Sequence, residues 1–176
     1  MQDFIKNILS DVRIELTDEF DRNFERKAFF DKPWDNTKIP NHKGSLMMRT
    51  GKLRKSISKP VQSNNQITWS SSLPYASLQN EGGEIIVTER MKRFFWAMFY
   101  KANGAVTTSG RGERNRRLSQ EAQTWKALAL QKVGAKMKIK QRQFIGDHPQ
   151  LRQSVERVID RNMRELEQEI FNRLRR

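Results

Sequence analysis

The chain has 176 residues, no cysteine, and 34 Lys and Arg against 20 Asp and Glu. This length fits a single domain, and the absence of cysteine excludes both a disulfide framework and a thiolate zinc site. Hydrophobic residues make up 36% of the chain, and its 10 Phe and 4 Trp are more than a chain without a packed core would carry. No apolar run approaches the roughly 20 residues that span a bilayer, and the N-terminal segment lacks a signal-peptide pattern. We therefore expect a globular protein that is made in the cytoplasm and has no membrane partner.

Most of the positive charge lies in two segments. Residues 43–59 hold 6 Lys and Arg and no acid, and residues 101–142 hold 11 against 2, whereas the rest of the chain is close to neutral. Such local basicity is typical of a surface that faces a polyanion. Solvated helix faces and loops without a partner are the alternative interpretation.

Two helices are predicted in the first third of the chain. From Gln2 to about Phe30, apolar residues recur at three- and four-residue steps, which is typical of an amphipathic helix, and Pro33 follows its end. A polar loop comes next. The run TGKL at residues 50–53 predicts the start of a short helix, with Thr50 as its cap and Leu53 on its buried side.

The middle of the chain predicts short strands around a helical turn. Residues 66–72 alternate apolar and polar side chains as a half-buried strand does, and residues 84–88 form a second strand candidate. Residues 75–80, which lie between them, fit one helical turn.

A helical insertion is predicted at about residues 89–133. Residues 89–101 carry a stripe of Met and Phe at helical spacing, residues 102–113 are small, polar and glycine-rich, and residues 113–133 return to helical spacing. The stripe fits a core or a subunit contact better than a ligand site. We therefore expect two helices joined by a loop.

The last part of the chain predicts a strand and a long helix. Residues 136–144 alternate in polarity, which places a row of cations on the outward face of a strand. Asp147 or His148 then caps a C-terminal helix that has Pro149 in its first turn. Long N- and C-terminal helices, a small β-sheet packed with them and the insertion together predict an α+β fold in one domain, residues 1–176.

The sequence contains no constellation that indicates catalysis. The two histidines, His42 and His148, lie in loop-like segments away from any patterned set of carboxylates, so neither a metal site nor a His-activated nucleophile is predicted. Glycine-rich residues 110–113 lack the Lys-Ser/Thr pair and the preceding strand of a P-loop. Most acids lie in the first and last helices at spacings typical of surface ion pairs. We expect no enzyme, no cofactor and no metal.

Four sequence blocks occur in an order that resembles the tailed-bacteriophage virion morphogenesis family, whose Mu-type members are tail completion or neck proteins. The blocks are WDNTKIP, LMMRTGKLRKSI, LPYASLQNEGG and IKQRQFIG. The matching positions are Trp34, Leu46, Thr50, Gly51, Leu53, Ser56, Tyr75, Ala76, Gly82, Arg142, Phe144, Ile145 and Gly146. Two features depart from the family pattern: Gln143 stands in place of a proline, and residues 87–135 are longer and more helical than the family's connection.

The resemblance implies a structural virion protein of the head–tail junction or tail end, located in the neck or tail of the virion and in the host cytoplasm during assembly. It implies a homo-oligomeric ring that completes or connects the tail, contacts other connector or tail proteins and surrounds the DNA passage. Cations in the lumen of such a ring attract phosphate without reading bases. The alternative is a free basic nucleic-acid-binding protein that uses residues 101–142.

Three groups of residues are the candidates for these roles. Positions expected to shape the fold are Trp34, Thr50, Gly51, Tyr75, Phe144 and Gly146. Candidates for contacting DNA or an acidic partner are Arg49, Lys52, Arg54, Lys55, Lys138, Lys140 and Arg142. Candidates for packing between subunits are Phe94, Phe95, Trp96 and Phe99.

Overall fold

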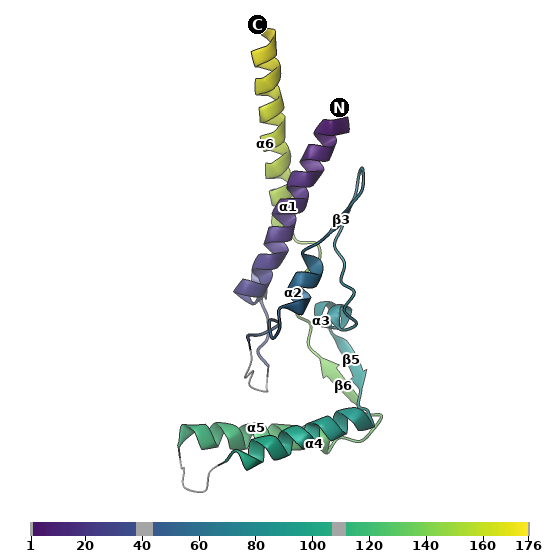
Figure 1. The fold of residues 1–176 in the computed structure, drawn as a ribbon, viewed down its shortest axis with the longest axis vertical. Helices are drawn as coiled ribbons and strands as arrows, with labels where there is room; N and C mark the ends of the chain where they lie inside the picture. Colours follow the sequence, from purple (N-terminus) through teal and green to yellow (C-terminus); the bar gives the residue numbers. More distant parts are fainter. Residues whose placement is uncertain (1, 38–43, 107–111, 176) are drawn as a thin grey trace.

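The computed structural model of the chain describes residues 2–37, 44–106 and 112–175. Helix α1 (Gln2–Arg26) and helix α6 (Pro149–Leu174) lie side by side and run in opposite directions, as Figure 1 shows. Between them in the chain come two short helices, α2 (Lys52–Ile57) and α3 (Ala76–Glu81), and two longer ones, α4 (Glu89–Gly104) and α5 (Glu113–Ala129). The predicted α+β fold with long terminal helices and a helical insertion is confirmed.

The strands of the described residues form three separate antiparallel pairs. They are β1 (Ala28–Phe29) with β2 (Lys32–Pro33), β3 (Val61–Gln62) with β4 (Ile67–Thr68), and β5 (Gly83–Ile86) with β6 (Lys136–Ile139). The strand predicted at 66–72 is therefore reduced to two residues. The strand predicted at 136–144 ends at Ile139, because the next backbone amides bond to α3: Arg142 donates to the Gln79 carbonyl at 2.7 Å.

The first helix ends four residues earlier than its apolar pattern predicts. Lys27 adopts a left-handed backbone with φ 57°, which stops the helix at Arg26. The Asn23 side-chain oxygen then accepts a hydrogen bond from the Phe30 amide at 3.1 Å, and the chain folds back as the β1–β2 hairpin. A bond between the helix side chain and the chain beyond it thus overrides the periodicity.

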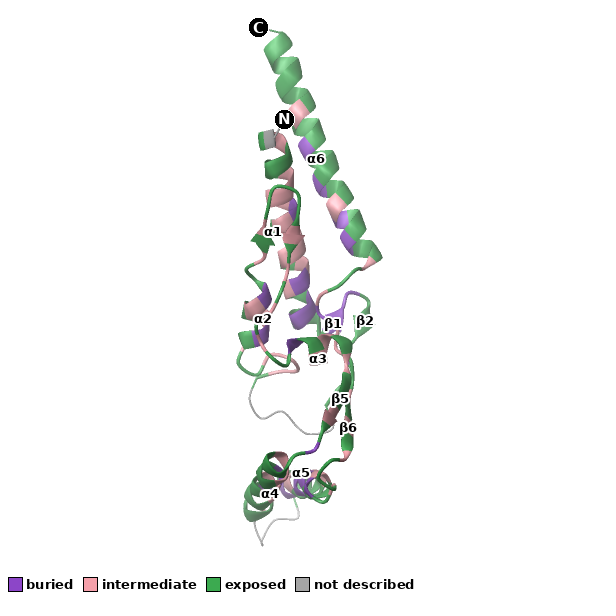
Figure 2. Ribbon diagram, turned by 90° about the vertical axis from the view of Figure 1, so that its right-hand side faces the viewer, coloured by how far each residue is buried: buried purple, intermediate pink, exposed green. Residues whose placement is uncertain are grey.

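Most of the buried apolar side chains gather where the C-terminal half of α1 meets α2, α3 and the start of α6 (Figure 2). We call this cluster the body core. Its members are Phe20, Phe24, Phe29, Phe30, Trp34, Leu53, Ile57, Ala76, Phe144 and Leu151.

Helices α4 and α5 pack on each other and have a core of their own. We call them the helical hairpin, and its buried residues are Phe95, Ala102, Ala122, Trp125 and Ala129. The two-stranded β5–β6 ribbon connects the hairpin to the rest of the chain (Figure 1). At the end of the ribbon the Val87 amide donates to Ala135 and the Gly134 amide donates to Val87, each at 2.9 Å, so the two ends of the insertion are neighbours.

The predicted helix starts are confirmed more closely than the ends. Helix α4 begins at Glu89 after Thr88, whose hydroxyl accepts from the Met91 amide at 3.2 Å, and it continues to Gly104. Helix α5 ends at Ala129, before the predicted 133. Of the glycine-rich segment predicted at 102–113, residues 107–111 lie outside the described residues, as does His42.

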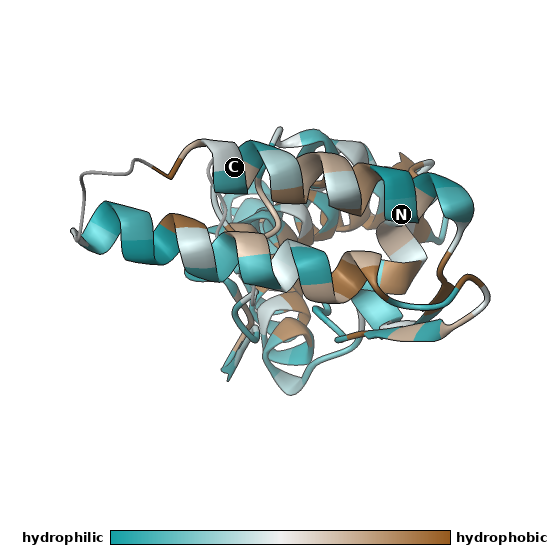
Figure 3. Cartoon of the chain, turned by 90° about the horizontal axis from the view of Figure 1, so that it is seen from below, coloured by the Kyte–Doolittle hydropathy of each residue, from teal (hydrophilic) through white to brown (hydrophobic). Residues whose placement is uncertain are grey.

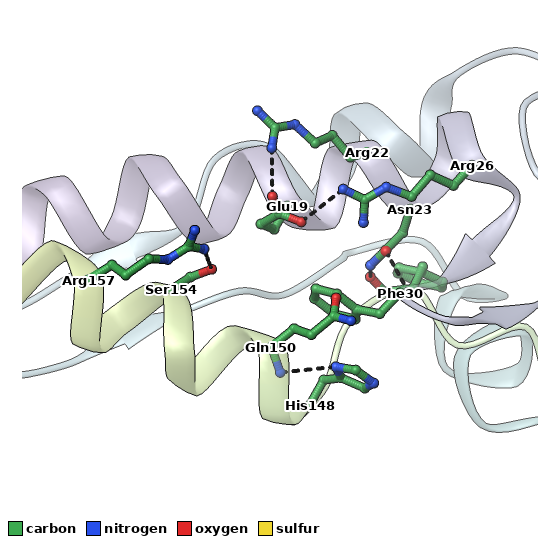
Figure 4. A network of polar contacts seen from close by, with 10 residues as sticks. Glu19, Arg22, Asn23, Arg26, Phe30, His148, Gln150, Ser154 and Arg157 are labelled. Carbon is green, nitrogen blue, oxygen red and sulfur yellow. Dashed lines mark hydrogen bonds and ion pairs between the residues drawn. The ribbon is translucent and has the colours of Figure 1, made fainter.

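Helix α6 begins as its sequence predicts. His148 is the capping residue, its Nδ1 accepts from the Gln150 amide at 3.3 Å, and Pro149 is the first helical residue (Figure 4). Asp147, the other predicted cap, forms an ion pair with Arg152 instead. The pKa of Asp147 is lowered, chiefly by that hydrogen bond.

Candidate functional site

The four blocks that carry the family resemblance meet in the body core. The Trp34 Nε1 donates to the Gln143 carbonyl at 2.7 Å, which joins the first block to the last across 109 residues of sequence. The Phe24 ring lies 5.7 Å from the Trp34 ring and 5.4 Å from the Phe144 ring, measured between centroids. Phe144 is only 1% exposed. Trp34 and Phe144, two of the residues expected to shape the fold, are thus both buried beside Phe24.

Two asparagines hold the last block in place. The Asn80 side-chain oxygen accepts from the amides of Phe144 and Ile145 at 2.9 and 3.1 Å. The Asn23 Nδ2 donates to the Phe144 carbonyl at 3.2 Å, and Asn23 is completely buried. Sequence reasoning missed both residues. The one available signal is that asparagine is unfavourable inside helices, which leaves Asn23 to be explained by a partner.

Two glycines of the blocks have backbones that other residues rarely adopt. Gly51 precedes α2 with φ 69°, and Gly82 follows α3 with φ 74°. A Cβ on Gly82 would also lie 2.9 Å from the Gln141 nitrogen, so the close approach of α3 to the last block needs glycine. The residue in the capping position of α2 is Gly51, whereas Thr50, the predicted cap, accepts only a long bond of 3.4 Å from the Lys52 amide. Gly146 lies in the bend before α6.

A surface hollow of about 450 Å³ lies where all four blocks adjoin. We call it the basic hollow. Three predicted partner-facing cations, Arg49, Lys52 and Arg142, line it together with the fold-shaping residue Tyr75, and none of its described lining residues is acidic. The described lining residues are Thr37, Leu46, Met47, Arg49, Thr50, Gly51, Lys52, Leu53, Tyr75, Gln79 and Arg142.

A second hollow of about 510 Å³ adjoins the basic hollow and adds Lys27 to the cations around it. The two share Arg49, Thr37, Leu46 and Met47. Because Arg49 and Lys52 are exposed and have no described charge partner, they can donate hydrogen bonds to an incoming anion. Phosphate and carboxylate groups are the anions that such donors bind best. The arrangement is suited to binding an anionic group.

Two of the seven predicted cations are neutralised within the chain. Arg54 forms ion pairs with Asp21 and Glu25 of α1, the second at 2.7 Å, and the hydrogen bond with Asp21 is the main cause that raises the pKa of Arg54. The Lys140 ammonium lies 2.8 Å from an Asp35 oxygen. These two side chains therefore hold the fold together and have less charge to offer a partner.

The remaining two cations lie away from the basic hollow. Lys55 is exposed on α2 and Lys138 is exposed on β6, and neither has a charge partner among the described residues. Among the described cations of the second basic segment, Arg142 joins Arg49 and Lys52 of the first segment at the basic hollow, and most of the others are spread over α4, α5, β6 and the last block. On α5, Glu113 pairs with Arg116 and Arg117 at 2.8 and 3.0 Å.

The four predicted subunit-contact aromatics have different surroundings. Phe95 is buried in the hairpin core with its ring centroid 6.0 Å from that of Trp125. Trp96 and Phe99 are half-buried and contact each other edge to face at 5.7 Å. Phe94 is 54% exposed, so it is the member of this group with most surface left for another molecule.

No protein-family model, curated protein or solved structure matches this chain. Among the described residues, no three His, Asp or Glu side chains gather as metal ligands. None of the described helices combines the length and apolarity that a membrane crossing requires.

Proposed function

We propose that this protein is a structural, non-enzymatic subunit of a tailed-phage virion. As a neck or tail-completion protein it forms a ring of identical subunits at the head–tail junction or tail end, next to other connector or tail proteins. The observation that carries the proposal is that the four resemblance blocks, which span residues 34–146, come together in the body core. The Trp34–Gln143 bond and the Asn80 bonds to Phe144 and Ile145 join the first, third and last blocks. The second block packs in the same cluster through Leu53 and Ile57. Residues from all four blocks of the family pattern, such as Trp34, Leu53, Ala76 and Phe144, thus pack into the same core.

The shape of the molecule also supports a role as an assembly subunit. Helix α6 extends past the N-terminal end of α1, and the helical hairpin stands off at the opposite end of the molecule (Figures 1 and 2). Large apolar side chains are exposed on both projections, including Tyr100 at 65% and Phe171 at 63%. Exposed apolar surface on projecting elements is characteristic of surfaces that other proteins cover.

The basic hollow gives each subunit one place to bind an anionic group. Repeated around a ring, Arg49, Lys52 and Arg142 would attract DNA phosphates without reading sequence, or would receive carboxylates of a neighbouring virion protein. A single hollow with three cations makes few phosphate contacts, so one isolated subunit should bind DNA weakly.

The proposal is tested by measuring assembly and DNA binding of the same purified protein. We expect oligomers by sedimentation, closed rings in negatively stained micrographs, and weak binding of a duplex DNA in fluorescence anisotropy. The variant Arg49→Ala/Lys52→Ala should reduce the residual DNA binding, whereas the control Lys138→Ala, which removes an exposed cation outside the hollow, should reduce it less.

The opposite result would identify the alternative function. A protein that stays monomeric at all concentrations and binds DNA tightly, with an affinity that falls steeply with salt, would overturn the ring proposal. It would favour a free nucleic-acid-binding protein that uses residues 101–142.

A further inference from the structure

Helix α6 has a second apolar side that α1 does not cover. Its side toward α1 carries the buried residues Leu151, Ser154, Val158 and Asn162. An adjacent stripe at steps of four and seven residues remains exposed, with exposed fractions that rise from 39% at Ile159 to 81% at Leu174. We call it the α6 stripe: Ile159, Met163, Ile170 and Leu174. Figure 2 shows the end of α6 as exposed on every side that is visible.

Acidic side chains border this stripe. At 100° per residue, Glu156, Asp160 and Glu167 fall on one edge of the stripe, beside Met163 and Leu174. All three are exposed, and none forms an ion pair with a described residue. A partner for the α6 stripe should therefore combine apolar and basic side chains.

The outer face of α4 has that composition. Arg90, Arg93, Phe94, Ala97, Tyr100 and Lys101 are all exposed, and their spacing places them on one side of the helix. We call these six residues the α4 face. Its aromatic side chains surround the small Ala97, and its three cations have no ion-pair partner among the described residues. In Figure 3, which views the molecule from below, brown hydrophobic residues alternate with teal hydrophilic ones along the ribbon of the helical hairpin.

The two surfaces lie at opposite ends of the elongated molecule and so cannot meet within one chain (Figure 1). The α4 face is shorter than the α6 stripe and fits within its length. The stripe from Ile159 to Leu174 spans 16 residues, about 24 Å at 1.5 Å per residue, and the α4 face from Arg90 to Lys101 spans 12 residues, about 18 Å. Asp160 and Glu167 are separated by about 11 Å along the helix axis, and Arg93 and Lys101 by about 12 Å.

We propose that the α6 stripe of one copy of this chain packs on the α4 face of the next copy. The contact joins two different surfaces, so it leaves a free surface at each end of any open chain of subunits. Repetition of such a contact closes a ring or extends a filament, according to the rotation between neighbours. The inference deepens the proposed function and rests on its claim that the protein assembles with itself.

Charge favours this pairing over symmetric ones. Two α6 stripes facing each other would bring Asp160 and Glu167 toward the acids of the other copy. Two α4 faces would likewise oppose Arg93 and Lys101. Like charges placed together across an interface are unfavourable, whereas the α6–α4 pairing places acids opposite cations.

The absence of native cysteine allows a direct crosslinking test. Met163→Cys is introduced at the centre of the α6 stripe in one preparation and Ala97→Cys at the centre of the α4 face in another. After the two full-length proteins are mixed and oxidised with diamide, we expect a disulfide-linked heterodimer, because the two sulfurs come within bonding range in the proposed contact. Each variant oxidised alone should stay uncrosslinked, as should Met163→Cys mixed with the control Ser63→Cys, an exposed residue outside both surfaces.

Charge reversal tests the electrostatic part of the contact. Arg93→Glu/Lys101→Glu in the Ala97→Cys chain should lower the yield of the heterodimer by about tenfold, and Asp160→Lys/Glu167→Lys in the Met163→Cys chain should do the same. Mixing the two reversed chains should restore the yield. A yield that is not restored, although circular dichroism shows both chains folded, would overturn the charge pairing.

The remaining outcomes separate this inference from the proposed function. Crosslinking of Met163→Cys with itself would replace the inference with a symmetric α6 contact. Rings in micrographs without the mixed disulfide would overturn the inference and leave the proposed function standing. A monomer without rings and without the disulfide would overturn both.

Discussion

The body core and the core of the helical hairpin are built in different ways. The body core unites side chains from Phe20 to Leu151, and its hydrogen bonds connect residues as far apart as Asn23 and Phe144, which are 121 positions apart in sequence. The hairpin core uses only α4 and α5, which follow each other in the chain. Local contacts form at a smaller cost in chain entropy than distant ones. The body, meaning the part of the chain outside the helical hairpin and the β5–β6 ribbon, should therefore fold as one cooperative unit. The hairpin should open and close more independently.

The largest loss of stability is expected from Phe144→Ala, which removes a ring at the centre of the body core. Phe144 is 1% exposed and contacts Phe24, so the variant leaves a cavity among residues from four sequence blocks. We expect the free energy of unfolding to fall by about 3–5 kcal/mol. Chemical denaturation followed by tryptophan fluorescence measures this change.

Phe171→Ala is the matched control for this prediction. It removes the same side chain from a position that is 63% exposed on α6, where little burial is lost in an isolated subunit. Its effect should stay within about 0.5 kcal/mol. If the two variants were equally destabilised, the body core would not hold the fold as described.

Asn23→Ala should produce the next largest loss of stability. The variant leaves the Phe144 carbonyl and the Phe30 amide without their partner in a site that water does not reach. The expected loss is roughly 2–3 kcal/mol, because buried polar groups without hydrogen bonds are costly. Figure 4 shows Asn23 reaching from α1 toward Phe30. Asn172→Ala, at an exposed position of α6, is the control and should unfold at the wild-type denaturant concentration.

Removal of the hairpin tests the difference between the two cores directly. Val87 is hydrogen-bonded to Gly134 and Ala135, so residues 88–134 can be replaced by the two-residue turn Asn-Gly without separating the strands of the ribbon. Val87, which is fully buried in the whole chain, is changed to Thr in the same variant to limit apolar exposure. We expect the body to keep its cooperative unfolding, with a melting temperature within about 5 °C of the wild type.

Circular dichroism supplies the second measurement on this deletion variant. Its signal should lose the contribution of α4 and α5, which have 16 and 17 residues, and no more. A deletion variant that fails to unfold cooperatively would show that the hairpin is part of the same folding unit as the body.

Sequence patterns predicted the elements whose causes are local. The start of α4 at Glu89 follows the apolar spacing of its own residues, and Pro149 marks the start of α6 because a first-turn proline acts on neighbouring residues. The predicted end of α1 was wrong. The true end depends on the bond from the Phe30 amide to the Asn23 side chain, which the apolar spacing does not reveal. The small sheet was foreseen, but its division into three pairs was not, since pairing is decided by which segments the core brings together.

At the candidate site too, sequence patterns predicted only the features whose causes are local. Charge alone singled out Arg49, Lys52 and Arg142, which do line one hollow. It could not distinguish them from Arg54 and Lys140, because the acids that pair with those two lie 33 and 105 positions away. Whether a cation is free or paired is a property of the packed chain.

The smallest change in stability is expected from the Asp35–Lys140 ion pair, which lies where the body meets the base of the ribbon. The Asp35 carboxylate accepts a hydrogen bond from Lys140, and this bond is the main cause that lowers the pKa of Asp35 from its ordinary value of 3.8. A carboxyl whose pKa is lower in the folded state stabilises the fold above the ordinary value and loses that contribution as the pH falls through the folded pKa. Asp35→Asn should therefore lower the melting temperature slightly at neutral pH. The difference from wild type should shrink as the pH falls below 3.8 and disappear once the pH is below the folded pKa.

The variant Lys140→Met shows whether Asp35 stabilises the fold through its pairing with Lys140 or through its negative charge in general. Both members of the pair are about 60% exposed, so solvent screens their attraction and only a small coupling remains. In the Lys140→Met background, Asp35→Asn should change the melting temperature less than it does in the wild type. An equal change in both backgrounds would mean that the Asp35 carboxylate acts through another charge. The candidate is Arg142, whose charge also lowers the pKa of Asp35 and whose Nε donates to the Asp35 carbonyl at 3.1 Å.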